Sequence, residues 1–108
     1  MSLKEKILIA DDSEMNQMLL EEILSDKYEY VMAKDGTEAV DILEKNEDID
    51  LVMLDINMPK IDGFGVLEIM NLRHWISEVP VIIISSESDV DFIRRGYDLG
   101  ASDYISRP

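Results

Sequence analysis

The sequence has no cysteine and only one histidine, His74. Without cysteine neither a disulfide framework nor a thiolate metal site can form, and a single histidine cannot build a zinc cluster. No segment reaches the ~18 apolar residues that a membrane-spanning helix needs. The N-terminus also lacks the apolar core of a signal peptide. We therefore expect a soluble, cytoplasmic domain that makes no membrane contact.

Basic residues are scarce as well. Ten lysines and arginines stand against 24 aspartates and glutamates, which gives a formal net charge of -14. Such a surface repels nucleic-acid phosphates and anionic membranes, so we expect no direct nucleic-acid binding by this domain. It does suit the binding of cations. The length of 108 residues, 46% of them apolar, indicates one compact domain with its own core.

Short apolar strands and amphipathic helices alternate along the whole chain. The alternation predicts right-handed βαβ crossovers and a parallel sheet with helices on both faces. Nothing follows the fifth strand, so we expect either that the chain is cut before a last helix or that a partner covers that sheet face. The expected strands cover residues 6–10, 30–33, 50–54, 81–84 and 102–106. Of the four expected helices, the first follows Ser13, the second begins at Thr37, the third covers 64–76 and the fourth covers 89–99.

Two of these helices have apolar stripes that we expect to face the core. The methionines of the first stripe are interpreted as core filling. The fourth helix should end at Gly100, since glycine is the usual C-cap residue. The stripes consist of Met15, Met18, Leu19 and Ile23 in the first helix and Val90, Ile93 and Tyr97 in the fourth.

Three carboxylates follow two of the expected strands, Asp11 and Asp12 after the first and Asp55 after the third. If these strands are neighbours in a parallel sheet, the acids converge at its carboxyl edge, where open α/β sheets bind ligands. Three like charges held close repel one another, and at least one would stay protonated unless a cation joined them. The sequence therefore predicts a divalent-metal pocket with one carboxylate free to act as a nucleophile.

Two further polar groups end strands, Ser85 the fourth and Arg107 the fifth. Phosphoryl transfer to a carboxylate uses such a set, because a metal and a cationic side chain neutralise the phosphoryl oxygens and a hydroxyl donates to one of them. Mg²⁺ suits the pocket, since it prefers one or two carboxylates together with waters and phosphate oxygens.

These residues lie in five segments that resemble, in order and at the usual spacing, the receiver domain of two-component response regulators. The resemblance implies the CheY-like, flavodoxin-like α/β fold: a doubly wound five-stranded parallel sheet in the order 2-1-3-4-5, with helices on both faces. It also implies that residues 1–108 are a single receiver domain, truncated before its C-terminal fifth helix. The segments are Ile9-Ala10-Asp11-Asp12, Met53-Leu54-Asp55-Ile56-Asn57-Met58-Pro59, Asp62-Gly63, Pro80-Val81-Ile82-Ile83-Ile84-Ser85 and Gly100-Ala101-Ser102-Asp103-Tyr104-Ile105.

The same resemblance implies the metal-binding roles. Asp55 matches the phosphoacceptor of the family, and Asp12 and Asp55 match its direct Mg²⁺ ligands. The backbone carbonyl of Asn57 matches a third ligand, and Asp11 is expected to act mainly through water.

The remaining matched positions concern the phosphoryl group and its effect. Ser85 matches the hydroxyl that binds the phosphoryl group, and Tyr104 matches the aromatic switch that turns inward with it. Asn57 and Glu87 match the two positions that tune dephosphorylation. One departure stands at Arg107, where the family has lysine before proline. A planar guanidinium either clamps a phosphoryl oxygen as the ammonium would, or alters how phosphorylation is transmitted.

The resemblance implies a phospho-accepting switch rather than an enzyme. A sensor histidine kinase or phosphotransfer protein would phosphorylate Asp55, and the face around the fourth helix and fifth strand would then control a C-terminal effector or a dimer. The alternative is a phosphorylation-silent interaction module, which only Arg107 favours. A hydrolase resembling the haloacid dehalogenases ranks lower, because Asn57 stands where that family needs a second acid and the chain has no room for a cap.

Overall fold

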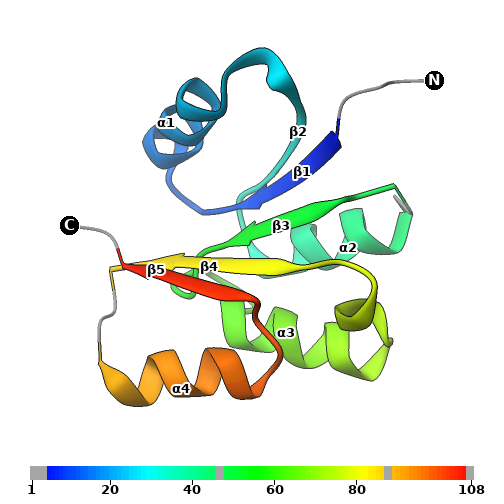
Figure 1. Cartoon of the computed structure of the whole chain (residues 1–108), viewed down its shortest axis with the longest axis vertical. Helices are drawn as coiled ribbons and strands as arrows, with labels where there is room; N and C mark the ends of the chain where they lie inside the picture. Colours follow the sequence, from blue (N-terminus) through cyan, green and yellow to red (C-terminus); the bar gives the residue numbers. More distant parts are fainter. Residues whose placement is uncertain (1–4, 46–47, 87–88, 107–108) are drawn as a thin grey trace.

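The computed structural model describes residues 5–45, 48–86 and 89–106. Five parallel strands form one sheet in the order β2-β1-β3-β4-β5 (Figure 1). Neighbouring strands that run parallel require crossover connections, and helices supply them. The predicted doubly wound parallel fold is thus confirmed. The strands are β1 (Glu5–Ala10), β2 (Tyr28–Ala33), β3 (Leu51–Leu54), β4 (Val81–Ser85) and β5 (Asp103–Ser106).

Four α-helices lie within the described ranges. None of them has both the length and the apolar character needed to cross a lipid bilayer. The predicted extension of the third helix to Ile76 is wrong, because His74 has a left-handed φ of 61° that ends α-helical hydrogen bonding. A short 3₁₀ turn, Trp75–Ser77, follows instead. The helices are α1 (Glu14–Leu24), α2 (Gly36–Lys45), α3 (Gly63–Leu72) and α4 (Val90–Asp98).

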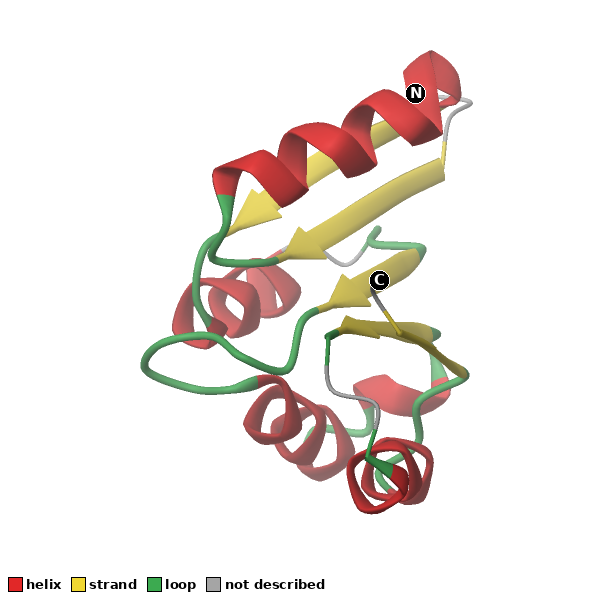
Figure 2. Cartoon of the chain, turned by 90° about the vertical axis from the view of Figure 1, so that its left-hand side faces the viewer, coloured by secondary structure: helices red, strands yellow, loops and turns green. Residues whose placement is uncertain are grey.

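The main core lies between one face of the sheet and helices α2 and α3. Successive strand residues point to opposite faces of the sheet. In β1, Leu8 and Ala10 therefore belong to this main core, whereas Ile7 and Ile9 are buried but lie outside it. Figure 2 places α1 on one side of the strands and the other three helices on the other. The carboxyl ends of the central strands remain at the rim between these layers.

The expected core role of the α1 methionines is wrong. Met15 is 72% exposed and Met18 69% exposed, and no residue of this fully described helix is buried. Leu20 and Leu24, on a neighbouring stripe of the same helix, are half-buried instead. Helical spacing identifies apolar stripes, but it does not decide which of two adjacent stripes packs on the sheet.

The expected inner face of α4 also needs correction. Val90 and Tyr97 are exposed, Ile93 is half-buried, and within this described helix only Gly96 is buried. A Cβ atom at Gly96 would lie 2.6 Å from Cδ1 of Ile83. The helix thus approaches the sheet through a residue that has no side chain, and the larger residues beside it are turned outward.

Candidate functional site

The first part of the site is the turn after β1. The backbone N–H of Asp11 donates to the carbonyl of Ala33 at 2.9 Å, which extends the β1–β2 pairing by one residue. The Asp11 carboxylate accepts a hydrogen bond from the N–H of Ser13 at 2.9 Å and is only 1% exposed. Asp12 is exposed, so the two neighbouring acids have different surroundings.

Gln17 on α1 holds this turn in place. Its side-chain Nε2 donates to the carbonyl of Asp11 at 2.7 Å and to that of Ala33 at 3.1 Å. It therefore fastens the ends of β1 and β2 together beneath the acids. Sequence reasoning missed this residue, and apolar periodicity gives no signal for a glutamine that bonds to backbone carbonyls.

Asp55 follows β3 at the same edge of the sheet. Its N–H donates to the carbonyl of Ala10 at 2.9 Å, continuing a parallel ladder in which Ala10 pairs with Leu54. The side chain is 6% exposed, and one of its oxygens accepts a long hydrogen bond of 3.4 Å from the N–H of Asn57. The strand register therefore brings the third predicted acid next to the first two.

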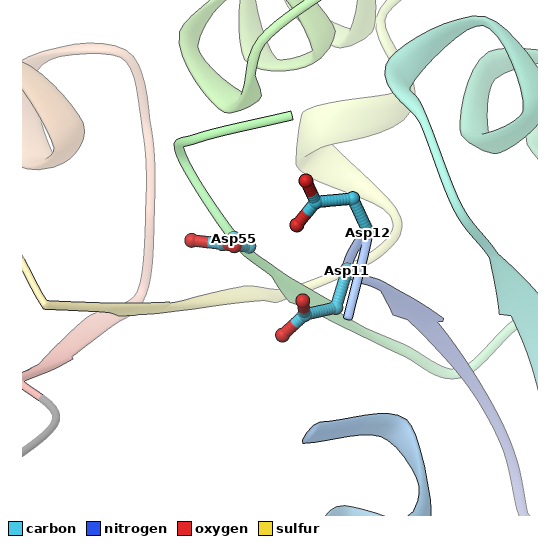
Figure 3. A group of neighbouring side chains, drawn as sticks. All are labelled: Asp11, Asp12 and Asp55. Atoms are coloured by element: carbon cyan, nitrogen blue, oxygen red, sulfur yellow. The ribbon is translucent and has the colours of Figure 1, made fainter. Parts of the chain in front are cut away.

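The three carboxylates do converge. One oxygen each of Asp11, Asp12 and Asp55 lies within 4.8 Å of the other two (Figure 3). Adjacent ligands of an octahedral Mg²⁺ stand about 3 Å apart and opposite ligands about 4.2 Å, so the carboxylates would have to move closer together, or bind partly through water, to hold such an ion. The group offers three carboxylate oxygens, and two of the three residues are buried. Oxygen donors of this kind are the ligands that a hard divalent cation such as Mg²⁺ prefers.

The loop after Asp55 is tightly built. The N–H groups of Met58 and Gly63 both donate to the carbonyl of Ile56, at 3.1 and 2.8 Å. A Cβ atom at Gly63 would lie 2.4 Å from the carbonyl oxygen of Asp55. Glycine at this position therefore allows the start of α3 to pass directly against the backbone of the acid.

The same loop is attached to the start of α2. Nζ of Lys60, a residue with φ of 71°, lies 3.6 Å from the carboxylate of Asp35. The pKa of Asp35 is held below its usual range, chiefly by the hydrogen bond from the N–H of Glu38 and further by Lys60. A Cβ atom at Gly36 would meet the carbonyl of Ile61 at 1.9 Å, so the two segments touch backbone to backbone.

Ser85 ends β4, as predicted, and it is fully buried. Since Leu54 pairs with Ile83, Ser85 lies at the same sheet edge as Asp55, one residue further along. Tyr104 on β5 is half-buried, and its ring lies beside Gly96 of α4. Arg107 and Glu87 lie outside the described residues. Arg107 follows Ser106, the residue that pairs with Ser85.

Comparison with known proteins gives a consistent result. The family described as the response regulator receiver domain matches residues 7–108. The chain is 43% identical over 106 residues to a probable transcriptional regulator, ycf27, of Porphyridium aerugineum. The match covers 97% of this chain but only 42% of that relative, so the chain spans less than half of its length.

Solved structures with the same fold include two of direct interest. The phosphorylated cyanobacterial phytochrome response regulator RcpA superposes with a TM-score of 0.89 at 32% identity, over 97% of this chain and 81% of that one. The Mn²⁺-bound form of response regulator Rcp1 superposes with a TM-score of 0.86 at 26% identity, over 96% and 81%. One of these relatives was thus studied phosphorylated and the other with a divalent metal.

Proposed function

The chain belongs to the response regulator receiver domains of two-component signalling, and on that premise we propose that it is a switch controlled by Mg²⁺-dependent phosphorylation of Asp55. Receiver domains are phosphoacceptors and not enzymes in the usual sense. We further propose that residues 1–108 form a single such domain. The observation that carries the proposal is the convergence of Asp11, Asp12 and Asp55 at one sheet edge.

The metal site would use the acids in different ways. Asp12 and Asp55 would bind Mg²⁺ directly, together with the backbone carbonyl of Asn57. Asp11 is fixed by the N–H of Ser13 and by the pairing of its own N–H with Ala33, which suits a group that orients a metal-bound water. When bound, the ion would neutralise phosphoryl oxygens next to Asp55.

The phosphoryl group would be transferred directly to an oxygen of the Asp55 carboxylate. An oxygen of Asp55 would attack the phosphorus of a phosphohistidine, so that a P–O bond forms as the P–N bond breaks. The imidazole nitrogen keeps the electron pair of the broken bond and takes up a proton. The Ser85 hydroxyl would donate to one phosphoryl oxygen and Arg107 would neutralise another.

The output would arise where Ser85 meets β5 and α4. We propose that movement of Ser85 toward the phosphoryl group lets Tyr104 turn further inward, which changes the surface of α4 and β5. Donors would be a sensor histidine kinase or a phosphotransfer protein, and the responding part would be a C-terminal effector or a dimer formed through this face. Asn57 and Glu87 would tune the rate at which the phosphoryl group is lost.

Binding of beryllofluoride, a mimic of the phosphoryl group, tests the proposal. Titration calorimetry in the presence of Mg²⁺ should give one site on the wild-type protein and none on Asp55→Asn. Asp41→Asn, which changes an exposed aspartate of α2, is the matched control and should bind like the wild type. No binding by the wild-type protein would favour the alternative, an interaction module that is never phosphorylated.

A further inference from the structure

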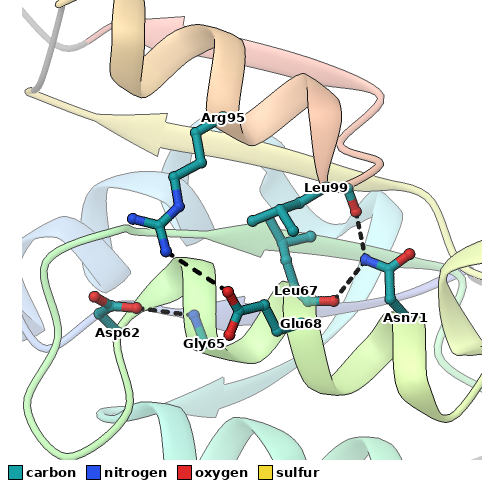
Figure 4. Close-up of polar contacts among 7 residues, drawn as sticks. All are labelled: Asp62, Gly65, Leu67, Glu68, Asn71, Arg95 and Leu99. Carbon is teal, nitrogen blue, oxygen red and sulfur yellow. Dashed lines mark hydrogen bonds and ion pairs between the residues drawn. The ribbon is translucent and has the colours of Figure 1, made fainter.

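Helices α3 and α4 pack side by side, and their contacts join particular side chains. At the N-terminal end the rings of Phe64 and Phe92 stack with centroids 5.8 Å apart. Further along, Figure 4 shows Arg95 of α4 extended toward Glu68 of α3, and Asn71 of α3 between the backbone carbonyls of Leu67 and Leu99. We call the contact of Arg95 with α3 and the contact of Asn71 with Leu99 the α3–α4 ties.

The first tie is centred on Arg95, which contacts two separate groups of α3. Its guanidinium carbon lies 4.3 Å from the centre of the Phe64 ring, and Nη2 lies 3.6 Å from Oε1 of Glu68. Both charged side chains are 56% exposed, so the ion pair alone is weak. The cation over the buried face of an aromatic ring adds a second attraction in the same place. Arg95 thus contacts α3 at two points, Phe64 and Glu68.

The second tie is centred on Asn71, which serves as a cap for the neighbouring helix. Its Nδ2 donates to the carbonyl of Leu99 at 2.6 Å and to the carbonyl of Leu67 in its own helix at 2.9 Å. Leu99 is the C-cap of α4, and carbonyls at that end of a helix have no partner within the helix. The end of α4 is therefore completed by a side chain of α3.

On its other side α4 touches the strands that carry the proposed switch. Gly96 lies against Ile83 of β4 and beside the ring of Tyr104, and β4 ends two residues after Ile83 at Ser85. Helix α4 is therefore placed between the Ser85–Tyr104 region and α3. A displacement of α4 that starts at Tyr104 cannot leave α3 unaffected while both ties hold.

We propose that the α3–α4 ties relay changes at Ser85 and Tyr104 to the C-terminal half of α3, with Arg95 as the main relay residue. This inference rests on the proposed function, because the change at Ser85 is the one that phosphorylation would cause. It adds a second surface that depends on phosphorylation, beyond the α4–β5 face. That surface is a shallow hollow of about 470 Å³ lined by Glu68, Asn71, Leu72, Asp98 and Leu99.

Backbone amide chemical shifts, recorded with and without beryllofluoride and Mg²⁺, test the relay. In the wild-type protein the amides of residues 69–72 should shift on binding, along with those of Asp55 and α4. In Arg95→Gln the shifts at 69–72 should be at least about twofold smaller, while those at Asp55 persist. Arg94→Gln is the matched control, since it removes the same charge from the exposed neighbouring position and should behave like the wild type.

Two further variants keep the test decisive should Arg95→Gln fold poorly. Arg95→Lys retains a cation beside Glu68 and Phe64 and should restore part of the amide shift change at residues 69–72. Asn71→Ala should reduce the same shift change while leaving Arg95 in place. Equal shifts at 69–72 in the wild type and in all tie variants, with a normal response at Asp55, would overturn the relay alone. The absence of any response at Asp55 in the wild type would instead overturn the proposed function, and the relay with it.

Discussion

The backbone N–H of Asp55 donates a hydrogen bond of 2.9 Å to the carbonyl oxygen of Ala10, the residue that precedes Asp11. This bond extends the β1–β3 ladder past the last residue of β3. The separation of Asp11 and Asp55 is therefore set by the register of two central strands and not by flexible loops. Sites built on such elements hold their geometry well.

Asp12 is the exposed member of the acidic group. We expect Asp12→Ala to weaken Mg²⁺ binding by more than about tenfold, because even residues that only support the direct ligands of a metal contribute that much to its affinity. Fold stability without metal should change little, because the side chain is not buried. A Mg²⁺ titration followed by calorimetry measures the affinity, with Asp41→Asn as control. An unchanged affinity in Asp12→Ala would remove this residue from the metal site.

Two glycines of the first turn of α3 should respond differently to alanine. In Gly63→Ala the new Cβ would meet the backbone carbonyl of Asp55 at 2.4 Å, and we expect a loss of about 2 kcal/mol or more in the free energy of unfolding. In Gly65→Ala the nearest atom is the Cγ2 of Ile61, the end of a side chain that can move. Urea denaturation should show a change of less than about 1 kcal/mol there. Equal losses in both variants would contradict the close approach at Asp55.

The lowered pKa of Asp35 predicts a pH-dependent contribution to stability. The folded-state pKa lies below the ordinary value of 3.8, mainly because the N–H of Glu38 donates to the carboxylate and secondly because Lys60 is near. The ionised group therefore stabilises the fold fully above the unfolded-state pKa, and this contribution is lost as the pH falls through the folded-state pKa.

The variant Asp35→Asn isolates this contribution, because asparagine keeps an acceptor for Glu38 but carries no charge. Urea denaturation should find the wild type more stable than Asp35→Asn at neutral pH. The difference should stay constant down to about pH 5 and shrink below pH 4, where the unfolded carboxylate is protonated. A difference that is the same at pH 7 and below pH 4 would show that the charge of Asp35 contributes nothing.

The exposed stripe of α1 leads to a prediction opposite to the one drawn from sequence. Met18→Gln should change the free energy of unfolding by less than about 0.5 kcal/mol, as is usual for surface positions. Met70→Gln is the matched comparison at a fully buried position of α3 and should cost about 2 kcal/mol or more, because it buries an amide. Similar losses in both variants would mean that Met18 is packed in this protein after all.

The strands and the three acids that follow two of them were predictable because both depend on local signals, whereas the strand order was implied only by the resemblance to receiver domains. Apolar runs followed by polar residues, as at Ala10-Asp11 and Leu54-Asp55, mark strand ends whatever the rest of the chain does. The orientation of α1 and α4 was not predictable from such signals. It depends on contacts between elements, such as the approach of Gly96 to Ile83, that spacing along one helix does not encode.

The same distinction applies within the site. Acidic residues that follow apolar strands can be recognised in the sequence. Gln17 instead acts through hydrogen bonds to the carbonyls of Asp11 and Ala33, which no sequence pattern reveals. The tie between Asn71 and Leu99 joins residues 28 positions apart. Interactions of this kind become visible only once the register of the sheet has placed the helices.

Transfer of a phosphoryl group to Asp55 is the central claim, and intact-mass measurement after incubation with acetyl phosphate and Mg²⁺ tests it most directly. We predict that the wild type and Asp41→Asn each gain the mass of one phosphoryl group, that chelation of Mg²⁺ prevents the gain, and that Asp55→Asn gains nothing. Undiminished uptake by Asp55→Asn, or no uptake by the wild type in the presence of Mg²⁺, would contradict the account.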